Sequence, residues 1–227
     1  MRGDACTYPF WRRKVEKRKV ITRRGRCLRG FFPSAKTGQN IPWESPLELD
    51  ALFLFEFSPG VRSYAEYQQK EIYYDEDGTQ KKCYPDYLLE LTDGSTALVE
   101  IKPTAKLRRT PTRRKYERIA AHFRAQGRPY LILTDDEIRR SPRLDNLKVL
   151  AYHAGRADEP GILSNVADFL SVANVTTLHE AEDLVGIQVV AELIREGLVA
   201  CPWDEPLGPS WTINANKEGR CHDALLF

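Results

Sequence analysis

The stretch that decides the fold runs from residue 86 to residue 102 and reads DYLLELTDGSTALVEIK. Two apolar runs flank the turn residues Thr92-Asp93-Gly94-Ser95, and this pattern predicts a β-hairpin. Because side chains alternate along a strand, Glu100 and Lys102 share one face while Ile101 points to the other. The second strand therefore presents a carboxylate and an ammonium group side by side.

The length of the turn determines whether Asp86 joins that pair. A three-residue loop, with a glycine at positive φ as its last residue, places Asp86 opposite Glu100. A two-residue turn places Asp86 opposite Ile101, on the other face. We expect the three-residue loop.

Charged side chains on a strand of Leu, Val and Ile need partners, because an unpaired charge is costly to remove from water. A bound cation is one such partner. Mg²⁺, with Mn²⁺ as the alternative, takes one or two carboxylates and keeps several waters, which suits Asp86, Glu100 and the carbonyl of Ile101. Lys102 would then hold an attacking water or neutralise charge on a phosphate. The alternative is a Glu100–Lys102 ion pair without chemistry.

A helix is expected before the hairpin, with Ser45 as its N-cap, Pro46 at its first position and an apolar run through residue 57. Glu48 lies three residues after the cap. Its carboxylate either returns to the backbone amide of Ser45 in a capping box, or faces the hairpin as a third acid of a metal site. Its rivals are Glu44, Asp50 and Glu56, of which Asp50 and Glu56 are expected to face solvent.

These residues resemble a known family, the TnsA endonucleases, which are subunits of the heteromeric transposases of Tn-seven-type bacterial transposons. The resemblance runs in blocks from about Arg26 to about Thr134. The blocks are Phe32-Pro33-Ser34-x-Lys36, Trp43-Glu44-Ser45-x-x-Glu48, Tyr84-Pro85-Asp86 and Glu100-Ile101-Lys102.

The resemblance implies an α/β fold with a restriction-endonuclease-like core, in which helices flank a mixed sheet. It implies a metal-dependent endodeoxyribonuclease that cuts the strands at transposon ends which its partner leaves intact. Glu48, Asp86 and Glu100 match the acidic motif positions, and Lys102 matches the motif lysine. The implied partners are double-stranded DNA, a TnsB-like DDE transposase and a TnsC-like AAA+ ATPase regulator.

The net charge of +2 hides a strong segregation of charge along the chain. Residues 1–36 hold twelve basic and two acidic residues, interleaved with aromatic ones such as Phe31 and Phe32. This composition favours a DNA-contacting arm over residues 1–40, with a basic tail without a fixed target as the alternative. The candidate phosphate contacts in the arm are Arg12, Arg13, Lys14 and Lys36.

A second basic cluster follows the hairpin, before a strand expected at residues 130–134. Tyr116, Ile119 and Phe123 recur at helical spacing, so one helix face should pack while its basic side stays near the candidate site. A solvated helix face without a ligand is the alternative. The cations are Lys106, Arg108, Arg109, Arg113, Arg114, Lys115 and Arg118, and all but Lys115 and Arg118 are assigned to DNA binding. The acids of residues 135–137 are expected at a helix N-terminus.

From Asp158 onward the charge reverses, with twelve acidic residues against three basic ones. Helices are expected near residues 162–172, 178–185 and 187–196, with a return strand near Trp211. This pattern is similar to a winged helix-turn-helix. Because its third helix offers one cation and two acids, we expect residues 158–214 to bind a protein partner, with a plain structural appendage as the alternative. The nuclease domain is expected over residues 41–157, and a tail over 215–227.

No apolar run reaches the length of a membrane helix, and no signal-type stretch follows the basic start, so a cytoplasmic, DNA-associated bacterial protein is expected. Five scattered cysteines support neither a disulfide framework nor a zinc site. Three functions remain open. They are a nuclease acting within a transposase, a stand-alone restriction or repair-type nuclease, and a non-catalytic DNA-binding regulator.

Overall fold

The structure, a computed structural model, describes residues 28–155, 160–215 and 225–227. Arg12, Arg13 and Lys14 lie outside the described residues, so the structure says nothing of their expected contacts.

A four-stranded mixed sheet forms the centre of the fold. Its strands, in spatial order, are β3 (Val61–Glu66), β6 (Tyr87–Leu91), β7 (Thr96–Ile101) and β8 (Tyr130–Leu133). The first three are antiparallel, and β8 pairs with β7 in parallel. The predicted hairpin and the predicted strand near residue 130 are both present. The expected mixed sheet flanked by helices is confirmed at this level.

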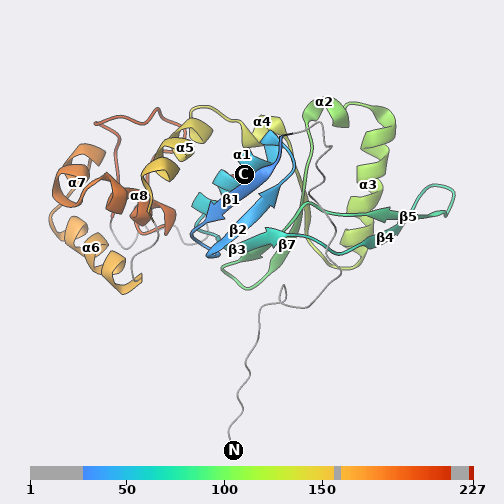
Figure 1. The fold of residues 1–227 in the computed structure, drawn as a ribbon, viewed down its shortest axis with the longest axis horizontal. Helices are drawn as coiled ribbons and strands as arrows, with labels where there is room; N and C mark the ends of the chain where they lie inside the picture. The colour runs from blue at the N-terminus through green and yellow to red at the C-terminus, as the bar shows by residue number, and fades with distance from the viewer. Residues whose placement is uncertain (1–27, 156–159, 216–224) are drawn as a thin grey trace, which may run out of the picture.

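Helices cover both faces of the sheet (Figure 1). Helix α1 (Pro46–Phe57) packs on the face formed by Tyr87, Leu89 and Val99. Its Ser45 cap accepts a hydrogen bond from the amide of Glu48, and Pro46 is its first residue, as predicted.

The other face of the sheet lies under α3 (Thr110–Ala125), through the predicted row of Tyr116, Ile119 and Phe123. The four-residue helix α2 (Thr104–Leu107) joins β7 to α3. Glu100 alternates with Val99 along β7, so it lies on the α3 face.

Two further hairpins were not predicted. Strands β1 (Gly30–Ser34) and β2 (Gln39–Trp43) pair with each other and pack Phe32 and Ile41 onto α1. Residues 28–40 are therefore part of the fold, and the β1–β2 hairpin continues past residue 40, where the arm was predicted to end. Strands β4 (Glu71–Tyr74) and β5 (Gln80–Cys83) form a hairpin beside α3, at the end of the molecule opposite α6 and α7 (Figure 1).

The C-terminal third is helical. It contains α4 (Asp135–Ile138), α5 (Arg143–His153), α6 (Pro160–Val172), α7 (Leu178–Val185) and α8 (Ile187–Arg195). The predicted helices near residues 162–172, 178–185 and 187–196 are present, and Asp135 opens α4 as expected. In place of a return strand, two isolated bridges join Thr177 to Thr212 and Ala200 to Asn214.

One hydrophobic core joins this third to the sheet. Phe57 of α1, Leu150 of α5 and Leu193 of α8 are all 0% exposed and belong to the same cluster. Arg195, read from sequence as an available cation, is 2% exposed and donates to the carbonyl of Gly155 at 3.1 Å. The predicted boundary at residues 157 and 158 therefore does not divide the described core into two.

Two acids expected to face solvent are buried instead. Asp50 is 7% exposed and pairs with Arg139 at 2.8 Å and Lys148 at 2.7 Å. Glu56 is 4% exposed and accepts hydrogen bonds from the Ser34 hydroxyl, the Tyr64 hydroxyl and two backbone amides of the β1–β2 turn. Because α1 is covered on all sides, a buried acid on it needs hydrogen-bond or ion-pair partners.

Within the described ranges, every helix is too short or too polar to cross a bilayer.

Candidate active site

The turn between β6 and β7 sets the register that brings the candidate residues together. Its three loop residues are Thr92, Asp93 and Gly94, and Gly94 has φ of +84°. Tyr87 lies opposite Val99, so the next pair outward is Asp86 and Glu100. The predicted three-residue loop is confirmed, and with it the expected alignment.

The side chains at the end of this hairpin converge on one point. The ammonium nitrogen of Lys102 lies 2.5 Å from Oε1 of Glu100 and 3.3 Å from Oδ2 of Asp86. The carbonyl oxygen of Ile101 accepts a hydrogen bond from the same nitrogen at 3.0 Å. Three oxygen atoms from the predicted set of ligands therefore surround a single cationic group.

Backbone groups fix the direction of Asp86. Its Oδ2 accepts a hydrogen bond from the amide of Ile101 at 2.7 Å, and its own amide donates to the carbonyl of Val99 at 2.9 Å. The amide of Lys102 donates to the carbonyl of Leu133 at 3.0 Å, which ties the end of β7 to β8. The sheet itself thus positions the carboxylate and the lysine.

Glu100 is buried and held by tyrosines. It is 5% exposed, and its Oε1 accepts a hydrogen bond from the hydroxyl of Tyr116 at 3.0 Å. The hydroxyl of Tyr130 lies 3.5 Å from Oε2. Burial and the nearby charge of Asp86 raise the pKa of the Glu100 carboxyl, and Lys102 and Tyr116 oppose that rise.

Lys102 keeps its charge despite its partial burial. Burial lowers the pKa of its ammonium group, but the carboxylates of Asp86 and Glu100 together outweigh that effect and raise the pKa above its ordinary value. The direction of this shift favours the charged form of Lys102 beside the two acids.

Glu48 lies at the start of α1, and its hydrogen bonds are those of a cap. Its Oε2 accepts from the amide of Glu44 at 2.7 Å, where the capping interpretation expected the amide of Ser45, and its Oε1 accepts from the Ser45 hydroxyl at 2.9 Å. Burial raises the pKa of its carboxyl, and the negative charge of Asp86 raises it further. Glu48 is thus near enough to Asp86 for electrostatic coupling while it serves the helix terminus.

The oxygen donors suit a hard divalent ion with few protein ligands. In the described part of the chain, no group of three or more His, Cys, Asp or Glu side chains is arranged as a metal site. Mg²⁺ does not require one, since one or two carboxylates and several waters satisfy it. Asp86, Glu100 and the carbonyl of Ile101 provide such a set around the Lys102 nitrogen, so the residues present fit the expected ion.

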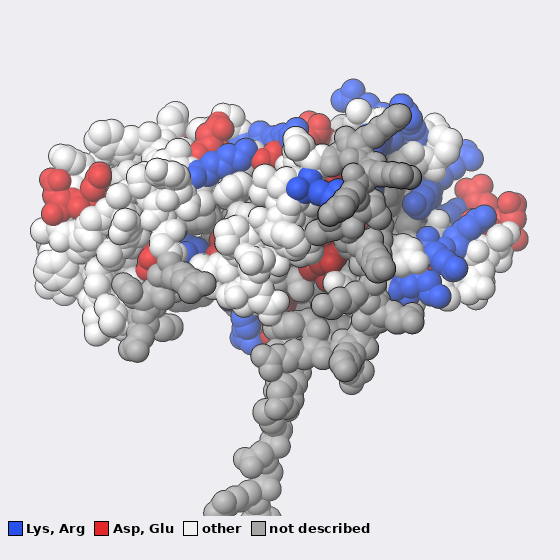
Figure 2. All heavy atoms as spheres, viewed as in Figure 1, with Lys and Arg blue, Asp and Glu red and all other residues white. Residues whose placement is uncertain are grey.

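Next to this point, α2 and the first half of α3 carry an exposed basic surface. Figure 2 shows Lys and Arg gathered at this end of the molecule, over α2, α3 and the β4–β5 hairpin. Arg113 pairs with Glu117 on α3 at 3.5 Å, and Arg118 pairs with Glu76 of the β4–β5 turn at 2.7 Å. The exposed predicted cations are Lys106, Arg108, Arg109, Arg113, Arg114 and Lys115.

Lys36, the remaining cation predicted to bind DNA, is used inside the fold. Its ammonium group donates to the carbonyls of Phe55 and Ser58, at the C-terminus of α1. Burial lowers the pKa of Lys36 to about 8, against the opposing effect of Glu56. This placement does not support a phosphate contact by Lys36.

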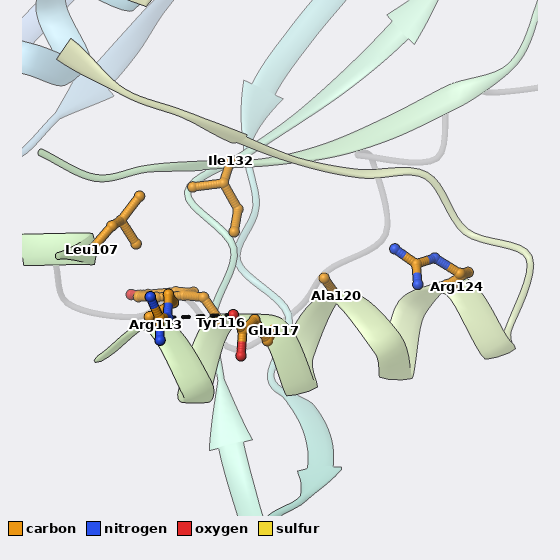
Figure 3. A pocket seen from close by; sticks show the side chains of 7 residues that line it. All are labelled: Leu107, Arg113, Tyr116, Glu117, Ala120, Arg124 and Ile132. Carbon is orange, nitrogen blue, oxygen red and sulfur yellow. Dashed lines mark ion pairs between the residues drawn. The ribbon is translucent and has the colours of Figure 1, made fainter. Parts of the chain in front are cut away.

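A pocket of about 490 Å³ lies beside the candidate site, between α3, the end of α2 and β8. Figure 3 shows its apolar lining, which includes Ile132 and Ala120, and two arginines, Arg113 and Arg124. Tyr116 belongs both to the wall of this pocket and to the hydrogen bonds of Glu100. The pocket is therefore connected to the site through one side chain.

Tyr116 and Tyr130 are the site residues that the sequence did not reveal. Helical spacing placed Tyr116 correctly on the packed face of α3, but periodicity says nothing of what a hydroxyl meets. The only available signal was that a buried tyrosine usually finds a hydrogen-bond partner.

Comparison of the sequence with protein-family models and with curated proteins finds no match.

Proposed function

We propose that this chain is a metal-dependent DNA endonuclease that cuts strands at transposon ends as a subunit of a heteromeric transposase. One observation carries the proposal: two carboxylates and a backbone carbonyl face one cationic nitrogen at the end of a hairpin. Mg²⁺, or Mn²⁺, is the proposed cofactor, held by Asp86, Glu100 and the Ile101 carbonyl, with Glu48 near Asp86 as the weaker candidate.

The chemistry needs both a cation and an ammonium group. A divalent ion at this point supplies Lewis acidity, which polarises a phosphate and acidifies a water molecule. The amide of Ile101 fixes the direction of the Asp86 carboxylate. Lys102 remains charged beside it and would stabilise negative charge on a phosphate oxygen or hold the attacking water.

The order of elements supports a restriction-endonuclease-like core. Helix α1 is followed by the antiparallel sheet strands β3, β6 and β7, with the β4–β5 hairpin inserted after β3, and then by α2, α3 and the parallel strand β8. The family resemblance carries the remainder of the proposal, namely the DDE transposase and AAA+ ATPase partners and the cytoplasmic, DNA-associated setting. The acidic C-terminal third, proposed as winged-helix-like, is assigned to partner binding because phosphates repel acids.

The basic surface of α2 and α3 supports duplex DNA as the substrate. It lies directly after β7 in the chain, so phosphates that it binds are brought to the end of the hairpin. Because Lys and Arg that neutralise phosphates release counterions, this surface provides affinity without sequence preference. End recognition is therefore assigned to the partner transposase.

A second candidate function is a DNA-binding regulator without chemistry. The ion pairs of Lys102 with Glu100 and Asp86 favour it, since they give each of the three groups a partner of opposite charge without a metal. The stand-alone nuclease of the same core remains the third candidate.

One experiment separates the three. A labelled duplex containing a transposon end is incubated with the purified chain, with and without a candidate partner transposase, in Mg²⁺ and in chelator. Our proposal expects strand cleavage only with both Mg²⁺ and partner. Robust cleavage by the chain alone would indicate the stand-alone enzyme. Binding without cleavage, whatever partner or metal is present, would contradict a nuclease.

A further inference from the structure

Glu100 is held by two groups that contact the same carboxylate oxygen. Its Oε1 lies 2.5 Å from the Lys102 nitrogen and 3.0 Å from the Tyr116 hydroxyl. Its Oε2 has a longer contact, 3.5 Å to the hydroxyl of Tyr130. The side chain is buried, so no bulk water replaces a partner that is removed.

The position of the Tyr116 hydroxyl is fixed by the packing of α3. Tyr116 is 6% exposed and shares its helix face with Ile119 and Phe123, which are 1% and 0% exposed. Three buried side chains along one helix face anchor the helix, so the hydroxyl cannot follow Glu100 if the carboxylate turns. Tyr116 is thus a rigid donor, whereas Lys102 is a flexible one.

This difference matters when a divalent ion binds. The ion and the ammonium group cannot occupy the same point, so Lys102 would have to withdraw from Glu100 for both carboxylates to hold an ion. From the contacts of the described residues, we propose that Tyr116 is a positioning residue, which holds the Glu100 carboxylate in its metal-binding direction after Lys102 has moved. The inference depends on the proposed function, because it assumes a cation between Asp86 and Glu100.

The principle is general for metal sites. Groups that hydrogen-bond to ligands fix their orientation, and their removal typically costs about 10-fold to 100-fold in metal affinity or activity. Tyr116 also follows directly after the exposed cations Arg114 and Lys115 in α3. The helix that contacts DNA in the proposed function therefore also carries the hydroxyl that orients the ligand.

The test is a titration of the full-length chain with Mn²⁺, in which the free ion is followed by its electron paramagnetic resonance signal. Tyr116→Phe removes the hydroxyl and retains the packed ring. Tyr130→Phe is the matched control, since it removes another phenolic hydroxyl beside the same carboxylate. Any Mn²⁺ binding that remains in Asp86→Ala measures binding at other places on the protein. Thermal melts and duplex affinity confirm that each variant is folded.

We expect about a 10-fold or larger rise in the Mn²⁺ dissociation constant for Tyr116→Phe, less than about a twofold change for Tyr130→Phe, and unchanged duplex affinity. Equal Mn²⁺ affinity in the wild type and Tyr116→Phe would overturn the inference and leave the proposed function intact. Equal losses in both tyrosine variants would also overturn it. If the wild type bound Mn²⁺ no better than Asp86→Ala, the metal site would fail, and the proposed function with it.

Discussion

At the ends of β6 and β7, one ammonium group contacts both carboxylates of the candidate site. The amides of Asp86 and Lys102 donate to the carbonyls of Val99 and Leu133, and these bonds do not involve the side chains, so changing the side chains should leave the sheet intact. Chemistry and folding can therefore be separated by mutation at these two positions.

We expect Asp86→Ala and Lys102→Ala each to abolish detectable strand cleavage in the complex with the partner transposase while duplex binding persists. Losing a metal ligand or the ammonium group should remove about 4 kcal/mol of transition-state stabilisation, a rate loss of about a thousandfold. Gel-based cleavage and binding assays measure the two effects. Glu90→Ala is the control, because Glu90 lies on the same hairpin but pairs with Arg62 and Ser63. Near-normal cutting by either variant would refute its assigned role.

Lys36 gives a prediction for the dependence of stability on pH. Its folded pKa is about 8, below the ordinary value of 10.5. Between these values the unfolded chain binds more protons than the folded one, so the contribution of Lys36 to stability rises with pH over this window. We expect the free energy of unfolding of the wild type, relative to Lys36→Met, to increase from pH 8 to pH 10. Urea denaturation at several pH values measures it, and a falling difference would contradict the burial of this ammonium group.

At the scale of elements, local chemistry made the central hairpin predictable. The turn glycine and the alternating apolar residues specify both strands and their register. The helices were predictable for a similar reason, since Ser45 and Pro46 mark the start of α1 within a few residues of sequence.

The hairpins β1–β2 and β4–β5 were missed because little in their own sequences specifies them. β5 has one buried residue, Cys83, and β1–β2 is held by contacts of Phe32 and Ile41 with α1. The burial of Asp50 and Glu56 escaped prediction because partners such as Arg139 and Ser34 are distant in sequence. Pairing of this kind is decided by the assembled fold.

The basic surface of α2 and α3 should act through charge. We expect Arg109→Gln and Arg114→Gln each to weaken duplex binding and to lower the slope of log affinity against log salt by about 0.9. Arg62→Gln serves as the control, since Arg62 lies on β3, which forms the edge of the sheet opposite β8. Fluorescence anisotropy at several salt concentrations gives the slopes. Unchanged slopes in both variants would remove this surface from the DNA interface.

At the scale of the whole molecule, the C-terminal helices and the sheet share one core. Leu193 of α8 is completely buried in the cluster that includes Leu52 of α1 and Leu89 of β6. The sequence suggested two units because charge changes sign near residue 158. The distribution of charge along the chain, however, describes the protein surface, whereas the division into domains depends on how the hydrophobic core is shared.

We expect Leu193→Ala to destabilise the entire chain by about 2–5 kcal/mol, because it leaves a cavity in the shared core. Hydrogen exchange should then show reduced protection in β6 and β7 as well as in α8. Native protection in β6 and β7 alongside rapid exchange in α8 would show that the two parts unfold separately.

The contact of Lys102 with both acids has a consequence for how the protein can be stored and regulated. Because the Lys102 ammonium group already pairs with Asp86 and Glu100, the ends of β6 and β7 do not need a divalent ion to hold the two carboxylates close together. The resting protein can therefore remain assembled in a metal-poor environment. In the proposed function, an incoming ion would have to exchange with Lys102, so the residue proposed to assist cleavage would also set how readily the ion binds.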